Sequence, residues 1–351
     1  MNIKEPKKHL EELTYDKNWE PPEIIYGNNL IKEATKTDLN YLVITMDIPW
    51  NLVKNSITKT PAQIIYVKNM HLASLIKIEN EILDNIEMVI GIGGGSCHDC
   101  AKYIAIKKKI RLIQLPTIFG GDAVVTTPTG IRNSKGTVEY IGCTYPDKIY
   151  IDFDLLRKAP PELIRYGAAD ILSSYTGLLD WKLAANRKNE KYDEDIADYA
   201  KINLLGKLQS KSKEIKQLTD EGIKTIIELY VEYHKIANKI KTDRPQEGSE
   251  HFFAYNAEYI SKRSFVHGSI LSLGIWVIAG FYYNKREEIE DFLNSLGLNF
   301  NLKSAGLNEN EFKLTLKTLN NFTIRGGYYY SIVNELEPTE SLIDDLIKLS
   351  N

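Results

Sequence analysis

The residues best suited to chemistry in this 351-residue chain include a run of three glycines, Gly93, Gly94 and Gly95, which is closed by Ser96. An apolar run at residues 88–90 precedes the glycines and a helical pattern follows them, so the order is strand, glycine turn and helix. Glycine lets backbone N–H groups approach an oxyanion closely, and a helix that begins there adds the positive end of its dipole. The stretch predicts a site for phosphate or pyrophosphate, with a simple tight turn as the alternative.

Two common phosphate-binding motifs do not match this stretch. The glycines are adjacent and so depart from G-x-G-x-x-G, and no Gly-Lys-Ser or Gly-Lys-Thr closes the loop as in a Walker sequence. Cys97 and Cys100 follow in a C-x-x-C spacing, but the chain has no second such pair to complete a zinc site. We expect these cysteines to pack a helix on a sheet as small apolar residues, with redox or zinc chemistry as the alternative.

The composition argues against several classes of protein. A net charge of −3 disfavours nucleic acid or an anionic membrane as a partner, because proteins that bind them usually carry a basic excess. No apolar run approaches the roughly 18 residues that a membrane span needs, so we expect no membrane insertion. Residues 1–20 are charged throughout, unlike a secretory signal, and three cysteines do not suggest a disulfide framework. We therefore expect a cytoplasmic protein.

Hydrophobic patterning divides the chain into two parts. In the first part, short apolar runs recur roughly every 15 to 20 residues with helical patterns between them, which predicts a parallel sheet covered by helices on both faces. In the second part, the helical patterns are long and alternating runs are few. We expect an α/β nucleotide-binding domain at residues 1–160 and a mainly α-helical domain at residues 161–351. The predicted strands are residues 24–26, 41–46, 64–67, 88–90, 112–115 and 148–152, and the longest helical patterns are residues 171–185, 191–209 and 218–240.

Two further features belong to the predicted α/β domain. Asp47 follows the second predicted strand, where a carboxylate can accept hydrogen bonds from the ribose hydroxyls of a dinucleotide. A helix N-cap or a turn aspartate ahead of Pro49 is an equal alternative. Two short β-like pieces, at residues 130–132 and 137–141, flank a hairpin-type turn at residues 133–136.

The glycine stretch resembles a known family signature. Together with Asp99, Ala101 and Lys102 it is similar to the G-G-G-S-x-x-D-x-A-K signature of the iron-containing alcohol dehydrogenase, glycerol dehydrogenase and dehydroquinate synthase superfamily. Residues 166–184, YGAADILSSYTGLLDWKLA, look like a G-x-x-D run and a T-A-x-x-D-W-x-L-A run of sn-glycerol-1-phosphate dehydrogenases. The resemblance covers most of the chain, and it implies a dehydroquinate-synthase-like fold.

This resemblance implies a metal site with three ligands. Asp170 matches the family's aspartate ligand, His251 in RPQEGSEH matches the second ligand, and His267 in FVHG matches the third. A catalytic zinc commonly takes three histidine or carboxylate ligands and keeps one position open. The separations, 251 − 170 = 81 and 267 − 251 = 16 residues, are too wide for a short metal motif. Zinc is the expected metal, and an Asp-His-His set also binds iron or nickel.

The resemblance also implies a reaction. Its members transfer hydride between NAD or NADP and a secondary alcohol or ketone, so we expect a small polyol or polyol phosphate as the partner of this chain. Asp122 matches an aspartate that reaches the substrate, and we expect it to be catalytic together with the three metal ligands. A homo-oligomer is implied by the resemblance alone. The expected cofactor-binding residues are Asp47, Gly93, Gly94, Gly95, Ser96, Asp99, Thr117 and Thr126.

The chain departs from the glycerol-1-phosphate pattern near the expected substrate. Tyr255 stands four residues after His251, where the family has a second histidine that contacts substrate. Tyrosine donates a hydrogen bond but carries no positive charge to a phosphate. Two glycines also replace the Ser-His pair ahead of Asp122. We expect sn-glycerol 1-phosphate and dihydroxyacetone phosphate as the substrate pair, with glycerol and dihydroxyacetone as the alternative.

A third alternative belongs to another class of enzyme. A lyase or cyclase similar to dehydroquinate synthase would use NAD transiently on a sugar phosphate. Such enzymes carry a V-G-G-K-T-G loop, whereas residues 124–130 here read VVTTPTG and contain no lysine. This difference weakens the lyase interpretation. A binding protein without catalysis is the least favoured reading, because all three proposed metal ligands are present.

Overall fold

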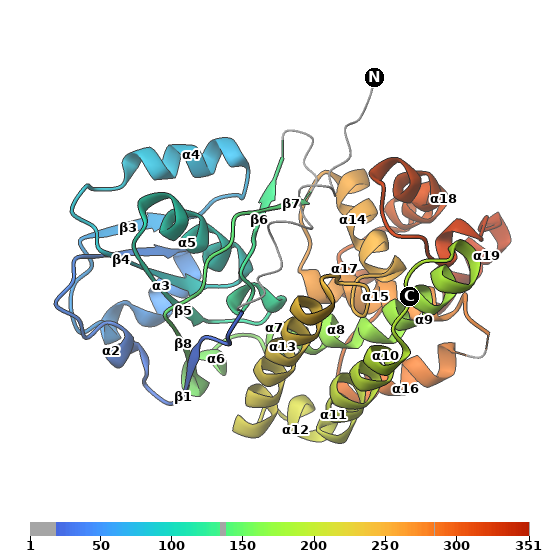
Figure 1. Cartoon of the computed structure of the whole chain (residues 1–351), viewed down its shortest axis with the longest axis horizontal. Coiled ribbons are helices and arrows are strands. Elements are labelled where there is room, and N and C mark those ends of the chain that lie inside the picture. Colours follow the sequence, from blue (N-terminus) through green and yellow to red (C-terminus); the bar gives the residue numbers. More distant parts are fainter. Residues whose placement is uncertain (1–18, 134–137, 284, 351) are drawn as a thin grey trace. The chain divides into compact units, whose positions relative to one another are not determined.

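A computed structural model describes residues 19–133, 138–283 and 285–350 of the chain. These residues form two compact units: an α/β unit that ends at Ile164 and a helical unit that begins at Arg165 (Figure 1). The expectation for residues 1–20 falls almost wholly outside the described residues, as does most of the predicted turn at residues 133–136.

The α/β unit contains a six-stranded sheet with the strand order β1-β8-β5-β4-β2-β3. Every neighbouring pair in this sheet is parallel. Parallel strands need long crossover connections, which is why helices alternate with the strands along the sequence. The predicted parallel α/β sheet is confirmed. Its strands are β1 (Glu23–Gly27), β2 (Tyr41–Thr45), β3 (Gln63–Tyr66), β4 (Met88–Gly93), β5 (Arg111–Pro116) and β8 (Lys148–Asp152).

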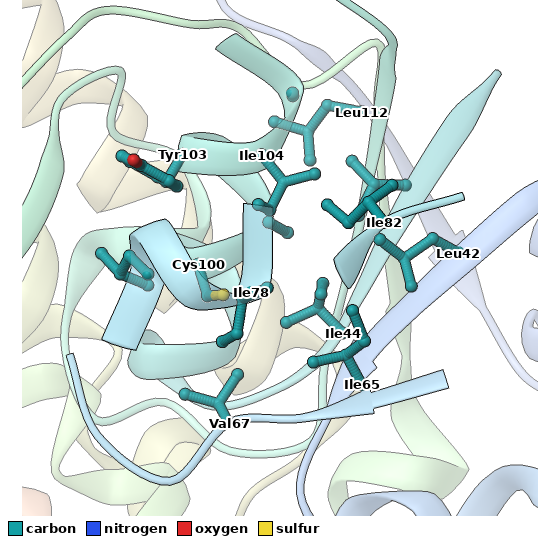
Figure 2. Close-up of a cluster of buried hydrophobic side chains, with 14 of the residues drawn as sticks. Leu42, Ile44, Ile65, Val67, Ile78, Ile82, Cys100, Tyr103, Ile104 and Leu112 are labelled. Atoms are coloured by element: carbon teal, nitrogen blue, oxygen red, sulfur yellow. The ribbon is translucent and has the colours of Figure 1, made fainter. Parts of the chain in front are cut away.

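Helices cover both faces of this sheet. The helices of this part of the chain are α2 (Ile31–Ala34), α3 (Asp47–Val53), α4 (Leu72–Glu81), α5 (Gly95–Lys108) and α6 (Phe153–Leu156), and α7 (Pro161–Arg165) leads into the helical unit. On one face Leu42 and Ile44 join the side chains of α4 and α5 in the apolar core that Figure 2 shows. On the other face Tyr41 and Val43 join those of α2 and α3. Successive residues of β2 therefore enter different cores, as the two-residue period of a strand requires.

A second, smaller pairing follows the sheet strand β5. Residues 118–128 contain one short 3-10 turn, η3 (Asp122–Val124). After them β6 (Thr129–Arg132) and β7 (Val138–Ile141) pair antiparallel, close to the bounds predicted from the sequence. Residues 134–137, which include most of the turn of this hairpin, lie outside the described residues.

Every regular element described from residue 167 onward is helical, so the predicted helical character of the second half is confirmed. α15 is apolar on all sides, with 12 of its residues buried, and it packs against α8, α14, α16 and α17. The helical pattern at residues 191–209 is interrupted by a π-helical segment, η4 (Lys201–Gly206). The helices are α8 (Gly167–Leu172), α9 (Ser174–Lys188), α10 (Glu194–Ala200), α11 (Lys207–Ser210), α12 (Ser212–Lys216), α13 (Asp220–Ile240), α14 (Ser249–Ser261), α15 (His267–Ala279), α16 (Arg286–Leu296), α17 (Leu302–Ala305), α18 (Glu309–Gly326) and α19 (Glu340–Ser350), with the 3-10 turn η5 (Ile332–Asn334).

None of the helices in the described ranges combines the length and the apolar character that a bilayer crossing requires.

Candidate functional site

The glycine turn joins β4 to the N-terminus of α5. The sequence predicted that the strand ends at residue 90, but β4 continues to Gly93, because the glycines pair with β5 as far as Pro116. Gly93 has a φ of +151°, and a Cβ on it would lie 2.5 Å from the Cys97 sulfur. Only glycine fits at this position, so α5 can begin directly beyond the strand end with the N–H groups of its first turn available to an anion.

Three of the predicted cofactor positions lie at one edge of the sheet. β2, β4 and β5 are adjacent and parallel, so Asp47, the glycine turn and Thr117 all follow the carboxyl ends of neighbouring strands. Ligands of open α/β sheets bind at this edge. The Thr117 N–H donates to the Gly93 carbonyl over 2.9 Å, which ties two of these strand ends together.

Asp47 is exposed at the start of α3. The N-cap of this helix is Met46, and no side chain caps it. The N-cap alternative for Asp47 is therefore wrong, while hydrogen bonding to a ribose stays a prediction.

A buried lysine organises the loop after β5. The Lys102 ammonium lies 2.7 Å from Asp99 Oδ1 and donates to Thr126 Oγ1 over 2.9 Å and to the Pro128 carbonyl over 2.5 Å. Burial raises the pKa of Asp99, and so does the charge of Asp122, while Lys102 opposes the rise. Three predicted residues, Asp99, Asp122 and Thr126, are thus close together. Lys102, which contacts two of them, was not predicted to have a role. The i, i+3 spacing of Asp99 and Lys102 on a helix was the available signal.

The C-x-x-C pair and its neighbour His98 are buried on α5. Burial raises the pKa of the Cys97 thiol to about 12, which leaves it protonated and unreactive near neutral pH. Cys100 lies in the apolar core beside Ile104, as the packing interpretation predicted. The His98 Nδ1 lies 2.6 Å from Gln114 Oε1, and the pKa of His98 is lowered to about 4, chiefly by burial.

The helical unit brings the three predicted metal ligands together. Asp170 lies on α8, His251 on the first turn of α14 and His267 at the start of α15. One ligand atom from each residue lies within 4.8 Å of the others. The Asp170 Oδ1 atom is 3.6 Å from each histidine Nε2 atom. Two ligands of a tetrahedral zinc, each about 2.0–2.1 Å from the ion, lie roughly 3.4 Å apart, so the set fits a small divalent cation.

Local packing explains why these helices converge. A Cβ on Gly268 would overlap the Tyr166 carbonyl oxygen, so only glycine lets the first turn of α15 pack against the backbone that leads into α8. His267 precedes this glycine and Asp170 follows that backbone by one helical turn. The close approach therefore brings His267 to Asp170.

Asp170 and His251 shift each other's pKa toward the charged forms. Burial alone would raise the pKa of Asp170, but hydrogen bonds and charge from both histidines hold it well below its ordinary value. Burial would likewise lower the pKa of His251, and its contacts with Asp170 and Glu250 raise it well above the ordinary value. An anionic carboxylate between two imidazoles therefore persists at neutral pH. This donor set is one that zinc, iron and nickel accept.

One buried acceptor beside the cluster has no donor among the described residues. Gln246 donates from Nε2 to Asp170 Oδ1 over 3.2 Å, while its Oε1 atom is buried and accepts no hydrogen bond there. A buried oxygen in this state costs about 1–3 kcal/mol. A hydroxyl group of a ligand at the cluster would satisfy it. Gln246 was not predicted from the sequence, because no spacing rule connects it to Asp170.

Tyr255 lies one helical turn beyond His251, and the two ring centroids are 5.9 Å apart. Its ring also lies 5.9 Å from that of Tyr328. Tyr255 is therefore close to one of the predicted metal ligands. Its contact with substrate stays a prediction.

Comparisons with known proteins agree with this fold. The chain superposes with a TM-score of 0.69 on a probable glycerol dehydrogenase from Sinorhizobium meliloti, at 17% identity over 95% of this chain and 98% of the other. It superposes with a TM-score of 0.68 on glycerol dehydrogenase from Schizosaccharomyces pombe, at 17% identity over 96% and 91% of the two chains. The α/β unit and the helical unit thus have the fold of the glycerol dehydrogenase class.

Sequence comparisons carry the identification further. Residues 27–160 match the family described as iron-containing alcohol dehydrogenase. Glycerol-1-phosphate dehydrogenase [NAD(P)+] from Pyrococcus abyssi is 26% identical over 79% of this chain and 83% of its own length. The enzyme of the same name from Methanothermobacter thermautotrophicus is 30% identical over 60% of each chain. These comparisons support the iron-containing alcohol dehydrogenase family, to which residues 27–160 are similar, and they indicate an NAD(P)-dependent enzyme of the alcohol dehydrogenase type.

Proposed function

We propose that this chain is a metal-dependent oxidoreductase that transfers hydride between NAD(P) and a small polyol phosphate, with sn-glycerol 1-phosphate and dihydroxyacetone phosphate as its substrate pair. The observation that carries the proposal is the convergence of Asp170, His251 and His267 from three separate helices. The names of the similar curated enzymes support the same substrate pair and the same cofactor.

The proposed metal ligands and substrate contacts have different roles. Asp170, His251 and His267 would hold zinc, with iron or nickel as substitutes. A divalent cation in this place supplies Lewis-acid chemistry, which polarises the oxygen of an alcohol or ketone. Gln246 holds the Asp170 carboxylate from one side and presents its buried Oε1 to a substrate hydroxyl. We propose that Asp122 contacts the substrate as well.

The α/β unit would bind the dinucleotide. The turn at Gly93, Gly94 and Gly95 presents backbone N–H groups to the pyrophosphate, and Ser96 lies in the first turn of the helix that follows. Asp47 and Thr117 follow the carboxyl ends of the two strands that neighbour β4, and they would contact the rest of the cofactor. Asp99 and Thr126 are held by Lys102, which keeps the loop beyond the turn in one conformation.

A second candidate substrate pair is glycerol and dihydroxyacetone. It is favoured by Tyr255, whose neutral phenol ring lies beside His251 at the position of the histidine that the glycerol-1-phosphate pattern contains. A phenol can hydrogen-bond to a hydroxyl group but adds no positive charge for a phosphate.

The test is an assay of both ketones with one preparation. The purified protein is freed of metal with a chelator and reloaded with Zn²⁺, and NADH or NADPH oxidation is followed with dihydroxyacetone phosphate or dihydroxyacetone. We expect turnover only after reloading, with a higher kcat/KM for the phosphate. A higher kcat/KM for the free ketone would replace the first substrate pair by the second. Equal turnover of the stripped and reloaded protein would overturn metal dependence.

A further inference from the structure

A buried carboxylate lies behind one of the proposed metal ligands. Glu250 is fully buried, and its Oε1 atom lies 2.9 Å from His251 Nδ1. The opposite nitrogen of the same ring, Nε2, faces Asp170 Oδ1. We propose that Glu250 is a positioning residue that fixes the ring orientation and the tautomer of His251 and strengthens its Nε2 atom as a metal ligand. This inference rests on the metal role proposed above for His251.

The donors around Glu250 leave it one role, that of an acceptor. The Gly248 N–H donates to Oε1 over 2.8 Å, and the Thr176 hydroxyl donates to Oε2 over 2.7 Å. Because an ionised carboxylate only accepts, the 2.9 Å contact between Oε1 and His251 Nδ1 is a hydrogen bond when Nδ1 carries the hydrogen. Nε2 is then the ring nitrogen at which a cation would take the place of a proton. A carboxylate behind a histidine ligand in this way fixes the ring and raises its basicity.

The backbone is shaped to admit this carboxylate. A Cβ on Gly248 would lie 2.8 Å from Glu250 Oε2 and 2.7 Å from Asp180 Oδ2, so glycine is needed beside both acidic groups. Both carboxylates lie at the N-terminus of α14, whose N–H groups and dipole favour negative charge. Asp180 accepts from the Ser249 N–H over 2.7 Å, and no hydrogen bond or ion pair joins Asp180 to His251 among the described residues.

These two buried carboxylates make a matched pair for experiment. Glu250→Gln keeps an acceptor toward Gly248 and His251, and its amide group can donate to the Thr176 hydroxyl, so mainly the charge is lost. Glu250→Leu removes the acceptor as well. Asp180→Asn removes a carboxylate from the same helix end but turns an amide group toward hydrogen-bond donors. Asp180→Asn should therefore lower the stability of the apoprotein at least as much as Glu250→Gln does.

The measurement is Zn²⁺ affinity, obtained by competition with a chromophoric chelator, alongside urea unfolding of each metal-free variant. Removing such a supporting group typically weakens metal binding 10–100-fold, so we expect about tenfold for Glu250→Gln and about a hundredfold for Glu250→Leu. Asp180→Asn should change affinity by less than about threefold, because Asp180 holds the helix end and makes no hydrogen bond or ion pair with a proposed ligand among the described residues. Unchanged affinity in Glu250→Leu, or a loss in Asp180→Asn equal to that in Glu250→Gln, would overturn the inference.

Thr176 provides a milder test through the other carboxylate oxygen. Thr176→Val removes the hydroxyl that holds Oε2, and Thr176→Ser keeps it. We expect a loss of Zn²⁺ affinity of a few-fold in Thr176→Val, on the order of one net hydrogen bond, with recovery in Thr176→Ser. Equal affinities in the two variants would contradict the proposed arrangement. If the unaltered protein bound no Zn²⁺ at this cluster, the proposed function itself would fail, which is a different outcome from normal binding by every variant.

Discussion

His98 and His251 are both buried histidines near the N-terminus of a helix, one in each unit, and they differ in the charge of the groups that face their rings. The Nδ1 atom of His98 faces the neutral amide of Gln114, whereas the Nδ1 atom of His251 faces the carboxylate of Glu250. Burial lowers the pKa of His98 to about 4, while the two carboxylates raise that of His251 well above its ordinary value. Residue type and burial alone therefore do not decide what a histidine does.

The comparison suggests separate roles for the two residues. His98 is a neutral packing residue, which braces the glycine turn against β5 through Gln114. In contrast, Glu250 lies beside the Nδ1 atom of His251, and Asp170 lies beside its Nε2 atom. An imidazole that donates to a carboxylate from one nitrogen is well suited to bind a metal through the other. Four substitutions test this contrast.

The largest expected effect comes from Asp170→Asn. This change removes the only anionic member of the proposed ligand set while keeping its size. We expect loss of the bound metal and a fall in kcat/KM on the order of a thousandfold, equivalent to about 4 kcal/mol. Metal content by elemental analysis and the ketone assay measure the two effects. Retained metal together with unchanged turnover would refute the assignment of this cluster.

The next effect concerns His98 and acid stability. The unfolded chain takes up a proton at this residue below about pH 6.5, whereas the folded chain does so only near pH 4. The contribution of His98 is thus fully present above pH 6.5 and is lost as the pH falls toward 4, by about 1.4 kcal/mol per pH unit and about 3 kcal/mol in all. In urea unfolding, His98→Asn should lose correspondingly less stability over this range. Parallel losses in the two proteins would contradict a neutral His98.

Gln114→Glu would give His98 a surrounding similar to that of His251. A carboxylate within hydrogen-bond distance favours the charged imidazolium, so we expect the pKa of His98 to rise by roughly 2 units. An NMR titration of the imidazole C–H signals would measure the change, with Gln209→Glu at an exposed position as the control. A His98 pKa that stayed near 4 would show that burial outweighs the partner.

Tyr255→His has the smallest expected effect. It introduces a titratable ring next to His251, at the position where the glycerol-1-phosphate pattern has a histidine. We expect the ratio of kcat/KM for dihydroxyacetone phosphate to that for dihydroxyacetone to rise about tenfold near pH 6, or about 1.4 kcal/mol. Tyr255→Phe is the control for loss of the hydroxyl. A ratio unchanged in both variants would place the phosphate away from residue 255.

Sequence patterns predicted the sheet well, because buried parallel strands are continuous apolar runs. The end of β4 was the exception: glycines 91 and 93 carry no apolar signal, yet they continue to pair with β5. The three proposed metal ligands were predicted only through resemblance, since 81 residues separate Asp170 from His251 and tertiary packing brings them together. Glu250 was missed because adjacent residues of a helix normally point to different sides.

The most direct test of the metal centre is anomalous X-ray diffraction from crystals of the protein soaked in Zn²⁺. We expect one strong peak at the zinc edge, bonded to an Asp170 carboxylate oxygen and to the Nε2 atoms of His251 and His267 at about 2.0–2.2 Å. A peak bonded through His251 Nδ1 would contradict the role of Glu250. The absence of a peak at these three residues, in crystals that bind zinc elsewhere, would contradict the metal centre itself.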